Sequence, residues 1–154
     1  MFAEQYKGGA ELTTDAIIES SLFPCNKLLS HTITVSTMEE YKNSFWIFGN
    51  FDSAPEQCLL YAAKNLNYSV LEYDYKYCHF RSPEKHALAS GKCDCHESRK
   101  GKIVSAFLHN AKTTWWMSHE QMKRYQETFP FLQNNNNKVL SLSLIHISEP
   151  TRRT

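Results

Sequence analysis

The chain has 154 residues, of which 42% are hydrophobic and 21% charged, and its formal net charge is +1. This length and composition predict one globular domain with a sizeable core. A net charge so close to zero gives no reason to expect a nucleic-acid partner or an anionic membrane surface. The sequence has no apolar run of about eighteen residues, so we expect no transmembrane segment.

The N-terminus, MFAEQYKGGAE, lacks the apolar stretch of a secretory signal. The chain contains five cysteines, an odd number. Without a signal, these residues are expected to be reduced thiols or metal ligands rather than disulfides, and we expect a cytoplasmic protein.

Helical and extended patterns alternate along the chain. The strand patterns are HTITV (31–35), SFWIFG (44–49), YSVLEY (68–73), TTWWM (113–117) and KVLS (138–141). The helical patterns are GGAELTTDAIIES (8–20), STMEEYK (36–42), APEQCLLYAAKNLN (54–67), GKIVSAFLHNAK (101–112) and SHEQMKRYQETF (118–129), the last opening with the capping box of Ser118 and Gln121. This alternation predicts an α/β fold: a Rossmann-like, open, mostly parallel sheet with helices on both faces.

Ligands of such sheets bind outside the carboxyl ends of the strands. Three segments follow predicted strands in this way: Gly49–Phe51, Glu72–Lys76 and Met117–Ser118. These are therefore the candidate binding positions.

The paired glycines Gly8 and Gly9 precede a helix that carries Glu11 in its first turn. Glycines at this point let the backbone approach a ligand and present free N–H groups to an anion, although a ligand-free turn is equally compatible with the pattern. Neither a dinucleotide-binding fingerprint nor a P-loop is present.

In EYDYKYC, Glu72 and Asp74 fall on one side of an extended chain, and Tyr73 and Tyr75 on the other. Carboxylates beside aromatic rings suit a sugar-like ligand. The alternative is a solvated strand end whose tyrosines pack on a neighbouring element. The following RSPEKH adds basic side chains that either receive a phosphate or carboxylate or form a solvated turn.

Cys78, His86, Cys93 and Cys95 follow the pattern C-x7-H-x6-C-x-C. Three cysteines and one histidine are a known ligand set for structural zinc, and His79 and His96 are alternative fourth ligands. The spacing differs from the common CxxC pairs, so two other interpretations stay open: reduced thiols around a surface loop, or a reactive thiol. A metal would close a loop with little apolar content.

GGAELTTDAIIES resembles the glycine-rich loop and first helix of GT-B glycosyltransferases of the family-four, group-one type. SFWIFGNF, VLEYDYKYCHFRSPEKH, CDCH and TTWWMSHEQMKRYQETFPFL resemble a subgroup associated with phage and environmental genomes. The resemblance implies that residues 1–141 are the N-terminal, Rossmann-like domain of an enzyme that transfers a sugar from a nucleotide-sugar donor to a glycan or other acceptor without a catalytic metal. It also implies that Gly8, Gly9 and Glu11 lie near donor and acceptor, and that Asn50 and Asp74 line the acceptor side.

The sequence departs from this family at both ends. The first strand expected before the glycine pair is missing, and so is the C-terminal domain that supplies most donor contacts. The tail LSLIHISEPTR (142–152) resembles a translated sequencing adapter, so we set residues 142–154 aside. We therefore expect a fragment that is inactive on its own. The alternatives are a small zinc-stabilised α/β binding module without catalysis, and another Rossmann-like enzyme acting on a phosphorylated ligand.

Overall fold

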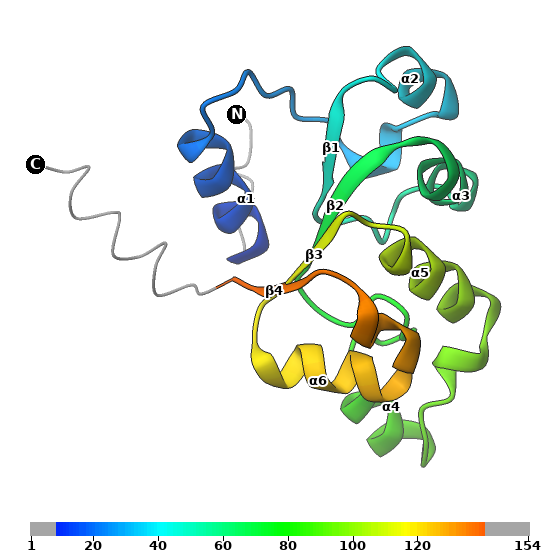
Figure 1. The fold of residues 1–154 in the computed structure, drawn as a ribbon. Helices are drawn as coiled ribbons and strands as arrows, with labels where there is room; N and C mark the ends of the chain where they lie inside the picture. The colour runs from blue at the N-terminus through cyan, green and yellow to red at the C-terminus, as the bar shows by residue number, and fades with distance from the viewer. Residues whose placement is uncertain (1–8, 141–154) are drawn as a thin grey trace, which may run out of the picture. The chain divides into compact units, whose positions relative to one another are not determined.

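A computed structural model describes residues 9–140, and the chain divides into two units (Figure 1). The smaller unit includes residues 9–27, with α1 (Gly9–Ser20), and the larger is Leu28–Leu140. Gly8 and the tail after residue 140 lie outside the described residues. The larger unit contains α2 (Val35–Glu40), β1 (Phe45–Phe48), α3 (Glu56–Asn65), β2 (Asn67–Glu72), α4 (Pro83–Ser90), α5 (Arg99–His109), β3 (Thr113–Trp116), α6 (His119–Thr128) and β4 (Asn137–Val139), with 3-10 turns at Ser30–Thr32, Cys95–Glu97 and Pro130–Asn134.

The four strands form one sheet in the order β1-β2-β3-β4, and every neighbouring pair is parallel. The predicted α/β, Rossmann-like class is therefore confirmed, with helices alternating between the strands. The predicted placement of helices on both faces is not seen for α5 and α6, which pack on one face. Right-handed crossovers in a sheet of sequential order place successive helices on the same face. The contacts agree, because Phe107 of α5 packs on Phe48 and Tyr68, and Tyr125 of α6 packs on Trp116. We call this the helix-packed face.

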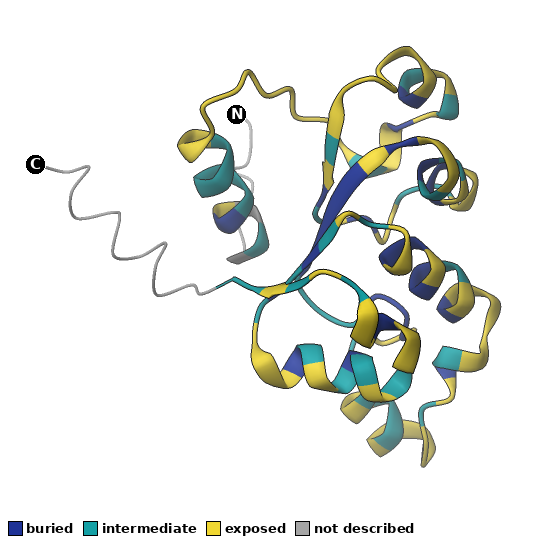
Figure 2. Ribbon diagram, viewed as in Figure 1, coloured by how far each residue is buried: buried dark blue, intermediate teal, exposed yellow. Residues whose placement is uncertain are grey.

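The core lies between the helix-packed face and its helices. The ring of Phe107 stacks on that of Tyr68, with 4.8 Å between the ring centroids. It meets the ring of Phe48 edge-on, with 5.1 Å between the centroids. The hydroxyl of Tyr68 donates to the backbone carbonyl of Phe107, so its polar tip is satisfied inside the core. Figure 2 shows the central strand β2 as buried along most of its length.

The edge strand β1 is less buried than its apolar sequence predicts. Phe48 faces the helices and is buried, but Phe45 and Ile47 point to the other face and are 59% and 54% exposed. An edge strand has a neighbour on one side only, so less of its surface is covered.

The predicted strand at 31–35 is wrong. His31 lies in a 3-10 turn, and Thr34 caps α2 by accepting a hydrogen bond from the Thr37 N–H. Ile33 is nevertheless buried, and its carbonyl receives the thiol of Cys58. The β-branched alternation is overridden because a threonine hydroxyl at a helix start satisfies a free backbone donor.

Helix α4 is absent from the sequence-based prediction, which treats RSPEKHALAS as a loop. Its start has a standard N-terminal signature: Ser82 accepts a hydrogen bond from the Lys85 N–H, and Pro83 occupies the first turn. Gly91 ends it in the left-handed conformation. The helix has no buried residue, and this explains why its sequence shows no helical periodicity of apolar residues.

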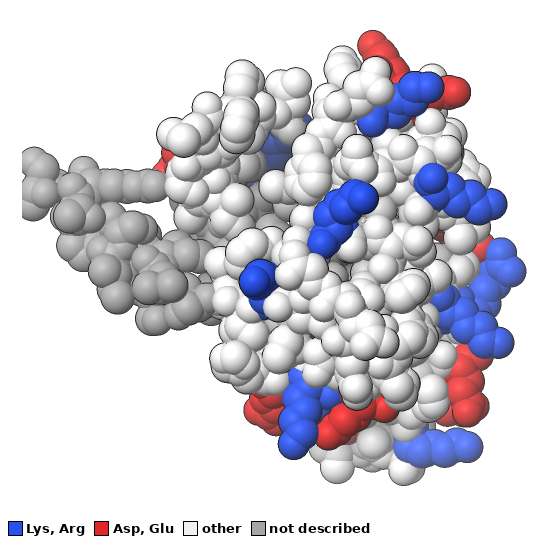
Figure 3. Space-filling view, viewed as in Figure 1, with Lys and Arg blue, Asp and Glu red and all other residues white. Residues whose placement is uncertain are grey.

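Among the described residues, no helix is long and apolar enough to span a membrane. On the face shown in Figure 3, acidic and basic side chains are interspersed along the rim, and isolated basic side chains stand on the otherwise uncharged middle. This distribution agrees with the net charge and offers no strongly basic surface on this face for a polyanion.

Candidate functional site

Three segments beyond the strands meet at one edge of the sheet: Gly49–Asp52 after β1, Glu72–Lys76 at the end of β2, and Met117–Ser118 after β3. We call them the carboxyl edge. The second and third segments are joined by hydrogen bonds through one side chain of α6, and Arg81 links the first to the second. From α6, Gln121 accepts the Met117 N–H through its side-chain oxygen and donates to the carbonyls of Glu72 and Asp74. The predicted capping box thus also ties α6 to β2, with Ser118 accepting from the Gln121 N–H.

A buried charge cluster occupies the middle of the carboxyl edge. Glu72 and Lys76 are both fully buried, and their side chains form an ion pair of 2.7 Å. Lys76 also contacts Asp74 at 3.0 Å, and the Tyr125 hydroxyl donates to the second oxygen of Glu72 at 2.5 Å. Burial raises the pKa of Glu72, while Lys76 and Tyr125 oppose that rise by stabilising the carboxylate. Nothing in the sequence singles out Lys76 as a buried residue.

Two of the predicted binding residues, Asn50 and Asp74, are brought together by Arg81. Its Nε donates to Asp74 at 2.6 Å, and its Nη2 donates to the side-chain oxygen of Asn50 at 3.3 Å. Asn50 is exposed and Asp74 is partly exposed. Of the other predicted binding residues, Gly9 and Glu11 belong to α1 in the smaller unit, and Gly8 lies outside the described residues.

The tyrosines of this region pack inward, as the alternative interpretation expects. The ring of Tyr75 stacks on that of Tyr125, with 5.5 Å between the ring centroids. The ring of Tyr77 meets Tyr125 edge-on, with 5.3 Å between the centroids. Burial raises the pKa of Tyr77 to about 12. These rings therefore contribute to the core between the carboxyl edge and α6.

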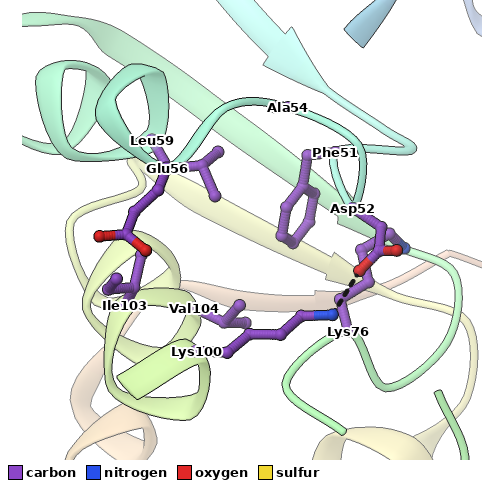
Figure 4. Close-up of a pocket in the computed structure, with 9 residues that line it drawn as sticks. All are labelled: Phe51, Asp52, Ala54, Glu56, Leu59, Lys76, Lys100, Ile103 and Val104. Atoms are coloured by element: carbon purple, nitrogen blue, oxygen red, sulfur yellow. Dashed lines mark hydrogen bonds and ion pairs between the residues drawn. The ribbon is translucent and has the colours of Figure 1, made fainter. Parts of the chain in front are cut away.

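A pocket of about 300 Å³ lies beside the carboxyl edge, between the starts of α3 and α5 (Figure 4). Its lining mixes apolar and charged side chains, and an ion pair of 2.8 Å between Lys100 and Asp52 lies across one side of it. Glu56, on the opposite side, pairs with Arg99. The lining residues are Phe51, Asp52, Ala54, Glu56, Leu59, Lys76, Lys100, Ile103 and Val104. The pocket is of a size that suits a small polar molecule.

The second feature is the group Cys78, His86, Cys93 and Cys95, which we call the Cys3His group. One ligand atom from each residue lies within 4.8 Å of all the others. Cys78 follows β2, His86 comes from α4, and Cys95 begins a 3-10 turn before α5. Residues far apart in this segment thus converge on one point, as a shared metal site requires.

Three of the ligand separations within the Cys3His group are close to those around a tetrahedral zinc ion, and all six are at most 4.8 Å. The sulfurs of Cys93 and Cys78 are 3.7 Å apart, and Nδ1 of His86 lies 3.3 Å from the sulfur of Cys95 and 3.7 Å from that of Cys78. Zn–S bonds of about 2.3 Å and Zn–N bonds of about 2.0–2.1 Å separate two sulfurs by roughly 3.8 Å, and sulfur from nitrogen by roughly 3.6 Å. All cysteines are free, and the sulfur separation is far longer than a disulfide bond. The four residues can therefore hold one metal ion.

The alternative ligands His79 and His96 lie outside the Cys3His group. His79 contributes through its backbone, because its N–H donates to the sulfur of Cys95 at 3.4 Å. His96 lies 3.8 Å from the carboxylate of Glu97. Burial raises the pKa of Cys93 to about 11, so its thiol keeps its proton at neutral pH until a metal displaces it.

The start of α5 supports the Cys3His group through the backbone of Cys95. Ser98, the N-cap of α5, donates its hydroxyl to the Cys95 carbonyl at 2.6 Å and accepts the Gly101 N–H. A β-carbon at Gly101 would lie 2.2 Å from the same carbonyl, so only glycine permits this approach. The sequence holds no signal for this role other than the glycine itself.

The three basic residues of RSPEKH do not form one anion site. Arg81 reaches the carboxyl edge and His86 joins the Cys3His group, whereas Lys85 is exposed on α4. The segment therefore links the two features of the site.

No protein-family model, curated protein sequence or solved structure matches the chain.

Proposed function

We propose that the Cys3His group holds one structural zinc ion that closes the segment Tyr73–Ser98. The observation that carries this proposal is the convergence of three sulfurs and one imidazole nitrogen at tetrahedral ligand separations. Four protein ligands fill a tetrahedral site, leaving no open position for water or substrate, so the ion stabilises rather than catalyses.

The segment needs such a closure because its helix is poorly packed. No residue of α4 is buried, and Leu88 is 88% exposed. A helix this short is marginal in water without tertiary packing. Metal binding supplies the missing free energy, since a ligand set that exists only in the folded chain couples binding to folding.

Zinc content tests the structural site. We expect one zinc per chain by elemental mass spectrometry, and loss of most of it in Cys93→Ser and Cys95→Ser. Cys25→Ser is the matched control, because Cys25 is an exposed cysteine outside the group. A Co²⁺-substituted protein should show the absorption of a tetrahedral thiolate site. A wild-type protein that purifies and reconstitutes without zinc would contradict the proposal.

We propose further that the larger unit belongs to the acceptor-side domain of a glycosyltransferase that uses a nucleotide-sugar donor. Support comes from the resemblance of the sequence segments and from the character of the carboxyl edge. Asn50, Asp74 and Arg81 place amide, carboxylate and guanidinium groups side by side in one partly exposed set. Such dense donors and acceptors suit the hydroxyls of a sugar acceptor.

Extending the gene beyond the region encoding Ser141 tests this second proposal. We expect a second α/β domain, sugar transfer by the extended protein with a panel of nucleotide sugars, and none by residues 1–141. Nucleotide release with and without acceptors is the measurement. Transfer by residues 1–141 would refute the two-domain account, and a stop codon just after Ser141 would favour a zinc-stabilised binding module without catalysis.

A further inference from the structure

Arg81 connects the Cys3His group to the carboxyl edge, and its backbone is unusual. Its φ of 56° is the one positive value among the non-glycine residues at 9–140. The left-handed conformation costs free energy for any residue with a β-carbon. At the end of α4 the left-handed conformation is adopted by a glycine, Gly91, with φ 84°. Arg81, which has a β-carbon and a long side chain, is therefore held in a strained backbone conformation.

The Cys3His group brackets the strained residue. Cys78 and His86 lie on either side of Arg81 in the chain, and the Arg81 N–H donates to the Cys78 carbonyl at 2.9 Å. On the other side, Ser82 caps the helix that carries His86. A metal ion bound by both residues would fix the two ends of this turn and so impose its conformation.

The side chain of Arg81 leads from this turn to the pocket. Asp74, which Arg81 contacts, also contacts Lys76, a fully buried residue that lines the pocket. Asn50, its other partner, directly precedes Phe51 and Asp52, which form another part of the pocket wall (Figure 4). Both sides of the pocket nearest to β1 and β2 are thus tied to one guanidinium group.

We propose that Arg81 is a positioning residue through which metal occupancy of the Cys3His group sets the shape of this pocket, making the pocket a metal-dependent binding site for a small polar ligand. The inference rests on the proposed zinc site. Without metal, the turn loses its two anchors and relaxes from the strained conformation. Arg81 then withdraws from Asp74 and Asn50. Asp74 is no longer held against Lys76, and the Lys76 side chain becomes accessible.

Amine labelling with an acetylating reagent tests the coupling. Lys76 is fully buried, whereas Lys123 on α6 is 77% exposed and serves as the internal reference. Because the Arg81–Asp74 contact is a charge-assisted hydrogen bond, we expect chelation of zinc to raise Lys76 labelling relative to Lys123 by roughly tenfold. Peptide mass spectrometry measures both sites in the same sample.

Variants of Arg81 in the zinc-loaded protein test the role of the side chain while the metal still holds the two ends of the turn. Arg81→Gly removes the strain and the guanidinium together, so we expect the same rise in Lys76 labelling with one zinc still bound. Arg81→Lys keeps a cation near Asp74 without the fork that reaches Asn50, so partial protection should return. A purely structural turn would be served as well by glycine and would leave Lys76 protected.

The outcomes distinguish the two proposals. Absence of zinc from the wild type overturns the zinc site, whereas bound zinc with Lys76 still protected in Arg81→Gly overturns the coupling alone. A rise in Arg81→Gly without a rise after chelation also overturns the metal link. Chelation that unfolds the whole chain by circular dichroism would also overturn the metal link, because the metal would then hold the entire fold rather than the turn at Arg81.

Discussion

The helix-packed face of the sheet and the segment Tyr73–Ser98 are ordered by different forces. On the helix-packed face, aromatic rings from β1, β2, β3 and α5 exclude water from one another, as Phe107 does between Phe48 and Tyr68. The segment Tyr73–Ser98 contains an unburied helix, Lys76 of the buried Glu72–Lys76 ion pair, and the four convergent residues of the Cys3His group. Hydrophobic burial is non-directional and tolerates small errors, whereas charge pairs and metal ligands require defined geometry. The first region should therefore unfold as a unit, and the second should respond to single changes at defined atoms.

The largest loss of stability is expected from Phe107→Ala. Phe107 is 1% exposed, and removing its ring leaves a cavity in the aromatic core. We expect the free energy of unfolding to fall by about 4 kcal/mol, measured by urea denaturation, while zinc content per folded chain stays unchanged. Phe131→Ala, at an exposed ring, is the control and should cost far less. A loss below about 1 kcal/mol for Phe107→Ala would mean that this ring is not central to the core.

Next in size is Lys76→Met, which leaves the buried carboxylate of Glu72 without its cation. We expect a loss of about 3 kcal/mol at neutral pH, and a much smaller one in the double variant Glu72→Gln/Lys76→Met, because a neutral pair no longer carries a buried charge. Urea denaturation of the three proteins measures both. Equal losses in the single and double variants would show that the pair does not act as a unit.

The same variant should depend on pH with a definite sign. Burial raises the pKa of Glu72 in the folded protein. The folded state therefore binds a proton more tightly than the unfolded state, and stability increases as pH falls through the folded-state pKa. The deficit of Lys76→Met relative to wild type should shrink on acidification. A deficit that grows at low pH would contradict the assignment of Glu72 as the uncompensated charge.

Zinc removal should have a smaller and more local effect. We expect faster hydrogen exchange across residues 78–98 and little change in β2 and β3, whose backbone bonds lie in the sheet. Hydrogen-exchange mass spectrometry of the zinc-loaded and chelated proteins makes the comparison. Uniform loss of protection through β2 and β3 would show that the two regions fold as one.

The smallest effect concerns the cap of α6. Ser118→Ala removes the acceptor of the Gln121 N–H and should lower the free energy of unfolding by about 1 kcal/mol. Ser118→Asp retains an acceptor at this position and should cost little. Thermal unfolding of the two variants measures the difference, and equal losses would exclude a capping role.

Much of the sheet and of the Cys3His group could be predicted from sequence. Compact apolar runs at β1, β2 and β3 and helical periodicity in α3, α5 and α6 identify the elements, because each buries a continuous face or stripe. The four metal ligands are recognisable because few other arrangements gather three thiols and an imidazole in eighteen positions. The prediction of a strand at 31–35 was wrong because the hydrogen bond of a helix N-cap outweighs the β-branched alternation there.

The remaining features depend on burial and charge pairing, which the residue types by themselves do not specify. From the sequence, Arg81 is interpreted as part of a basic cluster, but in the structure it pairs with Asp74 and Asn50. Lys76 is interpreted as part of a solvated strand end, but the fold buries it completely. The sequence by itself determined most of the order of elements, except the segment 31–35 and α4, and the candidate ligand set, since periodicity and residue chemistry are local properties. Only the tertiary structure decided which carboxylate meets which cation and where the pocket opens. The reason is that a charged side chain is buried only where a partner from another element compensates its lost hydration.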